Sequence, residues 1–148
     1  MWFYLESPNR LISSQNGVPG VIGRPEPKLF SIYCEGTGGF EAYFKGQSLY
    51  YRVIGPGYNE ESPENQKILI GDFLPQNWYY IGIEHEPQRM ITKAHVNIVI
   101  NNDLKRSVNM EYPKINNYTP LTKFSFGENL VGRISSIILF KNCIGQAK

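Results

Sequence analysis

The chain has 148 residues, of which 41% are hydrophobic and 19% charged. This composition is typical of a folded domain and excludes a disordered tail. The formal net charge is only +2 and the basic residues are scattered, so we expect no nucleic-acid-binding surface. No run approaches the ~20 apolar residues of a membrane span, and Met1–Leu5 lacks the basic start and cleavage site of a signal peptide. We therefore expect one cytoplasmic domain over residues 1–148, with no direct insertion into membranes.

Short apolar runs, rich in β-branched and aromatic residues and bounded by Gly, Pro, Asn or Asp, follow one another along the chain. Helical periodicity with caps is missing, apart from a short candidate helix at Ser62–Gln66. Two long loops, 9–27 and 55–66, interrupt the pattern, and we interpret the first as an insertion. We expect ten strands, at Trp2–Glu6, Lys28–Glu35, Phe40–Lys45, Ser48–Ile54, Lys67–Asp72, Trp78–Glu86, Ala94–Ile100, Leu104–Met110, Lys123–Phe126 and Gly132–Phe140.

Local patterns refine three of these strands. Gly36-Thr37-Gly38-Gly39 predicts a hairpin and not a phosphate loop, because a strand follows it where a phosphate loop needs Lys-Ser/Thr and a helix. Alternation in Trp78–Glu86 puts Ile81 and Ile83 on one face, which we expect to be the core face. Both faces of Gly132–Phe140 are largely apolar, which predicts a strand that is covered on both sides or buried at the centre of a sheet.

Four segments carry a resemblance to a known family. Leu29–Gly36 with Gly39–Phe44 is similar to that family's first hairpin, and Trp78–His85 to a strand that opens on Trp. Val96–Leu104 is similar to its Asp-Gly hairpin, and Leu130–Phe140 to its closing strand. In this order and spacing they resemble the concanavalin A-like (laminin G/pentraxin-type) domain of the BEACH-domain scaffold proteins, the neurobeachin-like family.

The chain departs from the family pattern in three places. Tyr79 stands where His is usual, Asn101-Asn102-Asp103 replaces the Asp-Gly turn, and the strand expected before Trp2 is absent. An edge strand of the sandwich is then missing, and unpaired backbone there would pair with another segment. We therefore expect the chain to be an excised module of a larger protein, an incomplete gene model or a stand-alone relative.

The resemblance implies an all-β fold, a two-sheet antiparallel β sandwich of the concanavalin A-like jelly-roll type. It also implies a non-catalytic protein-interaction or scaffolding module, in a protein of vesicle trafficking, lysosomal traffic or autophagy. The resemblance further implies that its partners are other proteins or neighbouring domains of its own chain, and that it reaches membranes through these partners. The first alternative is a carbohydrate-binding lectin-like domain, and the second is a degenerate glycoside hydrolase-like sandwich.

Five residues are expected to have structural roles. We place Trp78 in the core, where burying ~200 Å² at ~25 cal/mol/Å² contributes several kcal/mol, so that Trp78→Ala should unfold the domain. The resemblance makes His85 a structural position, packed and hydrogen-bonded at the strand end. The expected structural residues are Trp78, Ile81, Ile83, His85 and Phe140.

We expect no enzyme, no cofactor and no metal. Glu84 and Glu86, about 6.6 Å apart on an extended strand, come closest to a glycosidase carboxylate pair, but they lie at a strand end. His85 and His95 could hold zinc with a glutamate, although the structural role of His85 explains its presence without one. Cys34 and Cys143 lie in or beside apolar runs and are expected to be small buried hydrophobes.

The lectin alternative depends on exposed aromatic rings. The acidic residues are too sparse for a calcium-dependent site, so a glycan would have to bind on a calcium-free platform of tyrosines. Tyrosines serve protein interfaces equally well. The candidate binding residues are Tyr50, Tyr51, Tyr80 and Tyr118.

Overall fold

The computed structural model describes residues 1–6, 26–34, 36–55, 66–113 and 122–139. Within these ranges the chain forms strands and no helix. The strands are β1 (Trp2–Leu5), β2 (Lys28–Cys34), β3 (Gly38–Lys45), β4 (Ser48–Ile54), β5 (Lys67–Asp72), β6 (Trp78–Glu86), β7 (His95–Ile100), β8 (Asp103–Asn109), β9 (Thr122–Phe126) and β10 (Gly132–Ser135).

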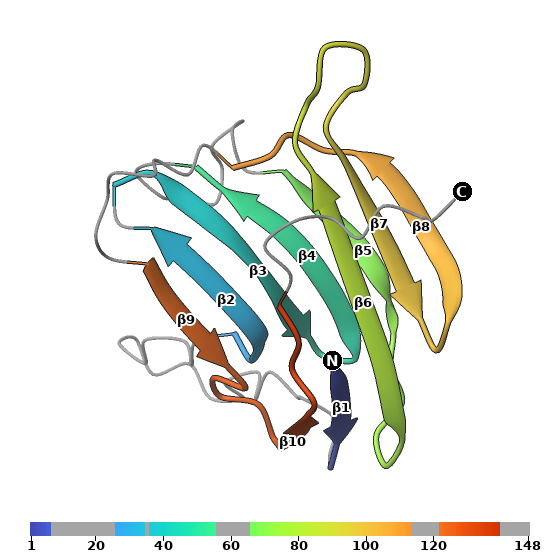
Figure 1. Ribbon diagram of the computed structural model, residues 1–148. Helices are drawn as coiled ribbons and strands as arrows, with labels where there is room; N and C mark the ends of the chain where they lie inside the picture. Colours follow the sequence, from blue (N-terminus) through green and yellow to red (C-terminus); the bar gives the residue numbers. More distant parts are fainter. Residues whose placement is uncertain (7–25, 35, 56–65, 114–121, 140–148) are drawn as a thin grey trace, which may run out of the picture.

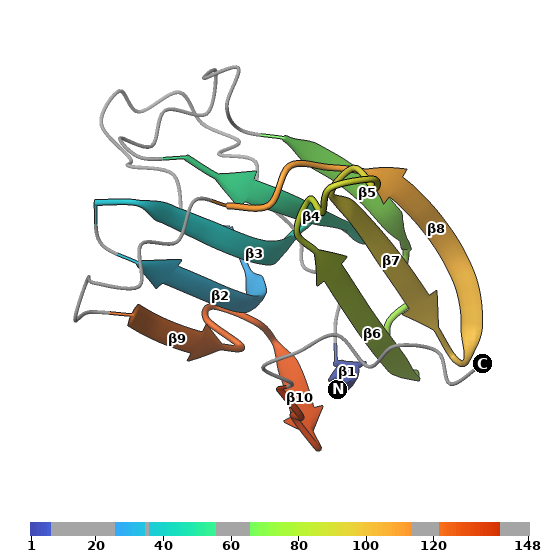
Figure 2. The ribbon, with the colours of Figure 1, turned by 45° about the horizontal axis from the view of Figure 1, so that its top comes forward.

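The strands pair as two antiparallel sheets of five. The first sheet has the order β10-β1-β6-β7-β8 and the second the order β5-β4-β3-β2-β9. Figures 1 and 2 show them as two layers, with β6 and β7 crossing in front of β4 and β5. The predicted all-β, two-sheet antiparallel sandwich is confirmed.

The core lies between the two sheets and is rich in aromatic rings. Phe3 on β1 has no exposed surface, and its ring centroid lies 5.3 Å from that of Phe73 and 6.0 Å from that of Phe44. In strands such as β1 and β7, alternate residues point into this core because side chains in a strand alternate between faces. The buried core cluster comprises Phe3, Leu5, Leu29, Phe30, Ile32, Ala42, Phe44, Leu49, Tyr51, Val53, Ile70, Phe73, Ile81, Val96, Ile98 and Met110.

Two hairpin turns use residues that accept positive φ. Gly36 and Gly38 have φ of 78° and 106° between β2 and β3, which confirms the predicted hairpin at these glycines. Asn101 and Asn102 have φ of 49° and 69° between β7 and β8. Asparagine is one of the few side chains that tolerates this region, so the Asn-Asn pair makes the tight turn for which the family pattern has Asp-Gly.

Trp78 was expected in the core, and this expectation is wrong. Its side chain is 47% exposed, whereas Ile81, three residues further along β6, is 2% exposed. Residues an odd number apart lie on opposite faces of a strand. Because Ile81 faces the core, Trp78 must face outward, and tryptophan's tendency to be buried does not change that register.

The last strand was expected to be covered on both sides or to lie at the centre of a sheet, which is also wrong. Strand β10 lies at the edge of the first sheet and ends at Ser135. Ser136 has a φ of 53°, which breaks the extended backbone. Beyond it Ile137, Ile138 and Leu139 are exposed, so this apolar run continues past the strand without entering the core.

Several sequence expectations fall outside the described residues. These are Phe140, Tyr118, Cys143, most of the loops 9–27 and 55–66, and most of the candidate helix Ser62–Gln66. Cys34, which is described, is a free and buried cysteine with 1% of its surface exposed.

Candidate functional site: an aromatic platform on the outer face

Two neighbouring strands bring four aromatic side chains to the outer face of the first sheet. Strands β1 and β6 pair antiparallel, with Trp2 opposite Tyr80 and Tyr4 opposite Trp78. The intervening residue of β1, Phe3, faces the core, so both of its neighbours face outward. We call Trp2, Tyr4, Trp78 and Tyr80 the aromatic platform.

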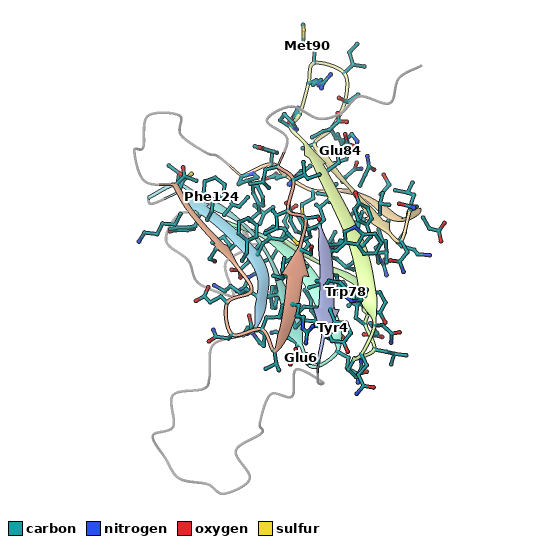
Figure 3. All side chains as sticks on the ribbon, turned by 60° about the horizontal axis from the view of Figure 1, so that its bottom comes forward. Tyr4, Glu6, Trp78, Glu84, Met90 and Phe124 are labelled. Atoms are coloured by element: carbon teal, nitrogen blue, oxygen red, sulfur yellow. The ribbon has the colours of Figure 1, made fainter. Side chains whose placement is uncertain are left out.

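The rings of the platform contact one another in cross-strand pairs. The centroids of Trp2 and Tyr80 lie 5.4 Å apart, and so do those of Tyr4 and Trp78. Both indoles keep nearly half of their surface exposed, 43% for Trp2 and 47% for Trp78, while the tyrosines are half-buried. Figure 3 shows Tyr4 and Trp78 on neighbouring strands of the same face. The cross-strand pairing positions each ring and leaves its outer side free for contact.

An ion pair borders the platform. Strand β10 places Arg133 opposite Tyr4, with its guanidinium 5.9 Å from the centre of the Tyr4 ring. The Nε of Arg133 donates a hydrogen bond of 3.2 Å to Oε1 of Glu6. The side chain of Arg133 remains 70% exposed. The surface therefore combines flat apolar rings with a polar, charged rim.

Tyr80 lies at the margin of the platform, where contacts with Gly82 and Asn101 position it. Gly82 follows Tyr80 on the outward face of β6, and a Cβ at Gly82 would lie 3.6 Å from the Tyr80 hydroxyl. The hydroxyl end of Tyr80 thus lies beside Gly82. Asn101 anchors the same strand, because its Oδ1 accepts a 2.9 Å hydrogen bond from the backbone N–H of Tyr80. These contacts hold Tyr80 in place at the margin of the platform.

The tyrosines named from the sequence lie in three different environments. Tyr80 belongs to the platform. Tyr51 is fully buried in the core, so its assignment to a binding surface is wrong: it shares the core-facing side of β4 with Leu49. Tyr50 is half-buried on the opposite side of β4, where it stacks on Tyr43 with centroids 5.6 Å apart. The fourth, Tyr118, lies outside the described residues.

His85 joins the two layers of the sandwich from the end of β6. Its Nε2 lies 3.2 Å from the carbonyl oxygen of Met110 and its Nδ1 lies 2.9 Å from the Tyr51 hydroxyl. A carbonyl can only accept, so Nε2 carries the proton and Nδ1 accepts from Tyr51. Burial lowers the pKa of His85 below its usual value, and the hydrogen bond to Met110 only partly opposes this. The neutral ring is therefore the form that the fold stabilises.

The carboxylates and the second histidine considered for catalysis or metal binding make other contacts. Glu84 accepts a hydrogen bond of 3.3 Å from the side chain of Asn97. Glu86 lies 3.8 Å from Arg89 and 3.9 Å from His95. Within the described ranges, no group of three or more His, Cys, Asp and Glu side chains is arranged to hold a metal ion.

A network of charged side chains lies on the side of the second sheet that faces away from the first sheet, and its central residues are buried. Glu41 on β3 is 1% exposed and accepts a 2.6 Å hydrogen bond from Nε of Arg52 on β4. Lys28 lies 3.1 Å from the same carboxylate, and Arg52 stacks 4.2 Å from the centre of the Tyr43 ring. Burial raises the pKa of Tyr43, and that of Tyr51 in the core, so both stay neutral at physiological pH. The saturated, buried contacts of this network point to a structural role.

The sequence analysis overlooked Trp2, Tyr4 and Arg133 as members of a surface. A signal was available, since Trp2-Phe3-Tyr4 and Trp78-Tyr79-Tyr80 carry aromatic side chains at successive positions. Successive residues of a strand alternate faces, so such a run must put rings on both faces of a sheet. That the two runs pair with each other depends on the strand order, which the sequence alone does not show.

Comparison with curated proteins finds similarity to a much longer protein. The chain is 28% identical over 131 residues to the BEACH domain-containing protein lvsE of Dictyostelium discoideum. The match covers 82% of this chain and 6% of that protein, so the chain spans a small part of the relative's length. No family model matches the chain, and no solved structure matches it. In the described part of the chain there is no helix long and apolar enough to cross a membrane.

Proposed function

We propose that this sandwich is a non-catalytic interaction module of a BEACH-type scaffold protein. The aromatic platform is its contact surface for a neighbouring domain of the same long chain. We also propose that the sandwich is of the concanavalin A-like type and that the whole protein acts in vesicle trafficking, lysosomal traffic or autophagy. The similarity to lvsE supports the scaffold context, and the exposed platform supports the contact.

The platform has the composition of a binding hot spot. Trp, Tyr and Arg dominate hot spots at protein interfaces, and the platform with Arg133 consists of only these residue types. The two exposed indoles can each bury a large apolar area at a small cost in side-chain entropy. The ion pair of Arg133 with Glu6 gives the polar rim that surrounds such a centre.

The choice of a domain of the same chain comes from the relative. In lvsE the matched segment is 6% of the length, so that segment is one part of a much longer chain. A neighbouring domain on one polypeptide is present at high effective concentration, and even a small contact surface then stays occupied. A glycan or a separate protein on the platform is a different outcome of the test below.

The scaffold context is tested by the size of the native protein. An epitope tag inserted at the genomic locus, read on a denaturing blot, should give a band far above the 17.0 kDa of this sequence. A band at 17.0 kDa would overturn the scaffold assignment. The platform itself needs a separate measurement.

The platform is tested by site-specific photo-crosslinking in the native-length protein. A photoreactive phenylalanine replaces Trp78 in one variant and Phe124 in the control, because Phe124 is a comparably exposed aromatic at 54% but lies on the second sheet. We expect crosslinks from position 78, and not from 124, to a peptide of another domain of the same chain. Equal crosslinking at both positions would refute the assignment, as would glycan binding that Trp78→Ala abolishes.

A further inference from the structure

The loop between β6 and β7 exposes two apolar side chains at its tip. Met90 is 104% exposed and Ile91 97%, which are the largest values among the big hydrophobic residues of the described ranges. Figures 1 and 3 show this loop projecting beyond the ends of the strands, with Met90 at its far end. A hydrogen bond of 3.0 Å from the Arg89 N–H to the Thr92 carbonyl closes the loop beneath them. The backbone therefore presents Met90 and Ile91 away from the rest of the molecule.

Basic residues flank the apolar tip on both sides. Arg89 precedes it and Lys93 follows it shortly after, and both are exposed. The segment 87–94 contains no acidic residue. Arg89 lies 3.8 Å from Glu86 at the base of the loop, and its side chain is 67% exposed. The tip is thus apolar at its end and cationic just behind it.

This arrangement matches the layers of an anionic bilayer. Apolar side chains can enter the boundary between headgroups and acyl chains, while cations behind them meet lipid phosphates. A stable protein interface buries about 800 Å² on each partner, which a projecting tip of two residues does not offer. The shape and the charge order of the loop therefore favour a lipid surface over a protein pocket.

We propose that the loop 87–94 is a membrane-interface anchor. Met90 and Ile91 insert shallowly into an anionic leaflet, and Arg89 and Lys93 bind its phosphates. The sequence analysis expected no direct membrane insertion, because it considered only long apolar runs and not two exposed side chains at a hairpin tip. Two residues make a weak and reversible anchor, which needs a second attachment to hold the protein at a membrane.

The test reads insertion directly on tethered protein, so that weak affinity does not limit it. The full 148-residue chain, with Cys143→Ser, is tethered by a C-terminal histidine tag to vesicles containing a nickel-chelating lipid. A polarity-sensitive fluorophore is attached at Met90→Cys, or in the control at Leu74→Cys. Leu74 is also an exposed apolar residue, at 61%, but it lies before the opposite end of β6.

On phosphatidylcholine vesicles containing phosphatidylserine, we expect the fluorophore at position 90 to shift to the blue and brighten, and that at position 74 to stay in water. Omitting phosphatidylserine, or introducing Arg89→Glu with Lys93→Glu, should abolish the shift. A fluorophore at 90 that stays in water on phosphatidylserine vesicles would overturn the proposal, as would equal shifts at both positions.

A flotation assay on untethered chain gives a second readout. Met90→Asp with Ile91→Asp should lower the vesicle-bound fraction more than tenfold, because each substitution removes one inserted apolar side chain. Leu74→Asp should leave it unchanged. Unchanged melting temperatures are expected for all three changes because these side chains are exposed, so a loss of binding would not reflect unfolding. Wild-type binding that the double aspartate variant retains in full would refute insertion.

Discussion

The buried charge pair between Glu41 and Arg52 should be among the most sensitive positions in the fold. Glu41→Gln keeps the size and shape of the side chain but removes its charge. The carboxylate of Glu41 is 1% exposed and faces both the guanidinium of Arg52, itself 8% exposed, and the ammonium of Lys28. The substitution leaves the Arg52 cation buried without its main counter-charge.

The expected loss of stability is about 3 kcal/mol. Removing one partner of a buried ion pair typically costs about 3–5 kcal/mol. The lower end applies here because Arg52 also lies 3.4 Å from Glu26, and because Lys28 is partly exposed and can be hydrated. For a domain of this size, a loss of about 3 kcal/mol lowers the melting temperature by roughly 10 °C.

The assay is urea denaturation of the wild type, Glu41→Gln, Arg52→Met and the double variant. The double variant should be far more stable than the sum of the single losses predicts, because it removes both charges of the pair and leaves neither of them buried alone. Arg133→Met, which breaks the exposed Arg133–Glu6 pair, is the control and should cost less than about 1 kcal/mol. If Glu41→Gln costs as little as this control, or if the single losses add, the two residues are not a buried, coupled pair.

Three further predictions follow from burial, titration and backbone geometry. Phe3→Ala should cost about 3–5 kcal/mol but Trp78→Ala only about 1–2 kcal/mol, because half of the Trp78 surface is exposed; equal melting temperatures would contradict the register of β1 and β6. The pKa of His85 is lowered in the folded state, so as the pH falls below about 6.5 the histidine takes up a proton in the unfolded state first. The free energy of unfolding should therefore decrease as the pH falls below about 6.5. A His85→Gln variant whose stability shows the same decrease would contradict this. Gly39→Ala should strongly destabilise the protein because the new Cβ would lie 2.0 Å from a backbone oxygen of β2. At Gly36 a Cβ meets no atom within 4 Å, so Gly36→Ala should cost only about 1–2 kcal/mol, through the positive φ of that residue. Thermal melts that rank the two variants the other way would show that this hairpin has a different geometry.

The positions of the strands could be predicted from the sequence because strand formation here is a local property. Ser48–Ile54, Lys67–Asp72 and Trp78–Glu86 were predicted with the bounds that the structure has. Each is a β-branched or aromatic run ended by glycine, proline or acidic residues. The exception is the last strand, where the apolar run Ile137–Leu139 continues beyond β10. The composition of this run predicts an extended strand, but β10 lies at the edge of its sheet and has only one neighbouring strand to pair with.

The binding surface could not be predicted because it depends on which strands pair. In the platform Trp2 lies opposite Tyr80, and at its border Arg133 lies opposite Tyr4. Arg133 and Tyr4 are more than a hundred residues apart in the sequence. The prediction that Trp78 lies in the core was based on its hydrophobicity alone. The alternation of β6, anchored on Ile81, already predicted the opposite face for Trp78. The periodic pattern was the better guide, because one strand cannot bury both of its faces when its sheet is covered on one side only.

Strand β6 connects the two proposed contact sites and keeps them apart. The platform residue Trp78 begins the strand, and the loop of Met90 leaves its other end after Glu86. Eight residue steps at about 3.3 Å put these ends about 26 Å apart. A bilayer at the loop tip would therefore leave the platform on the side of the molecule accessible to a neighbouring domain. Such a domain, held on the same chain as another membrane contact, would supply the second attachment that a weak anchor requires.

Met90→Asp with Ile91→Asp should then abolish insertion without changing the crosslinks from position 78. A loss of those crosslinks in vesicle-free protein would show that the two sites are not independent.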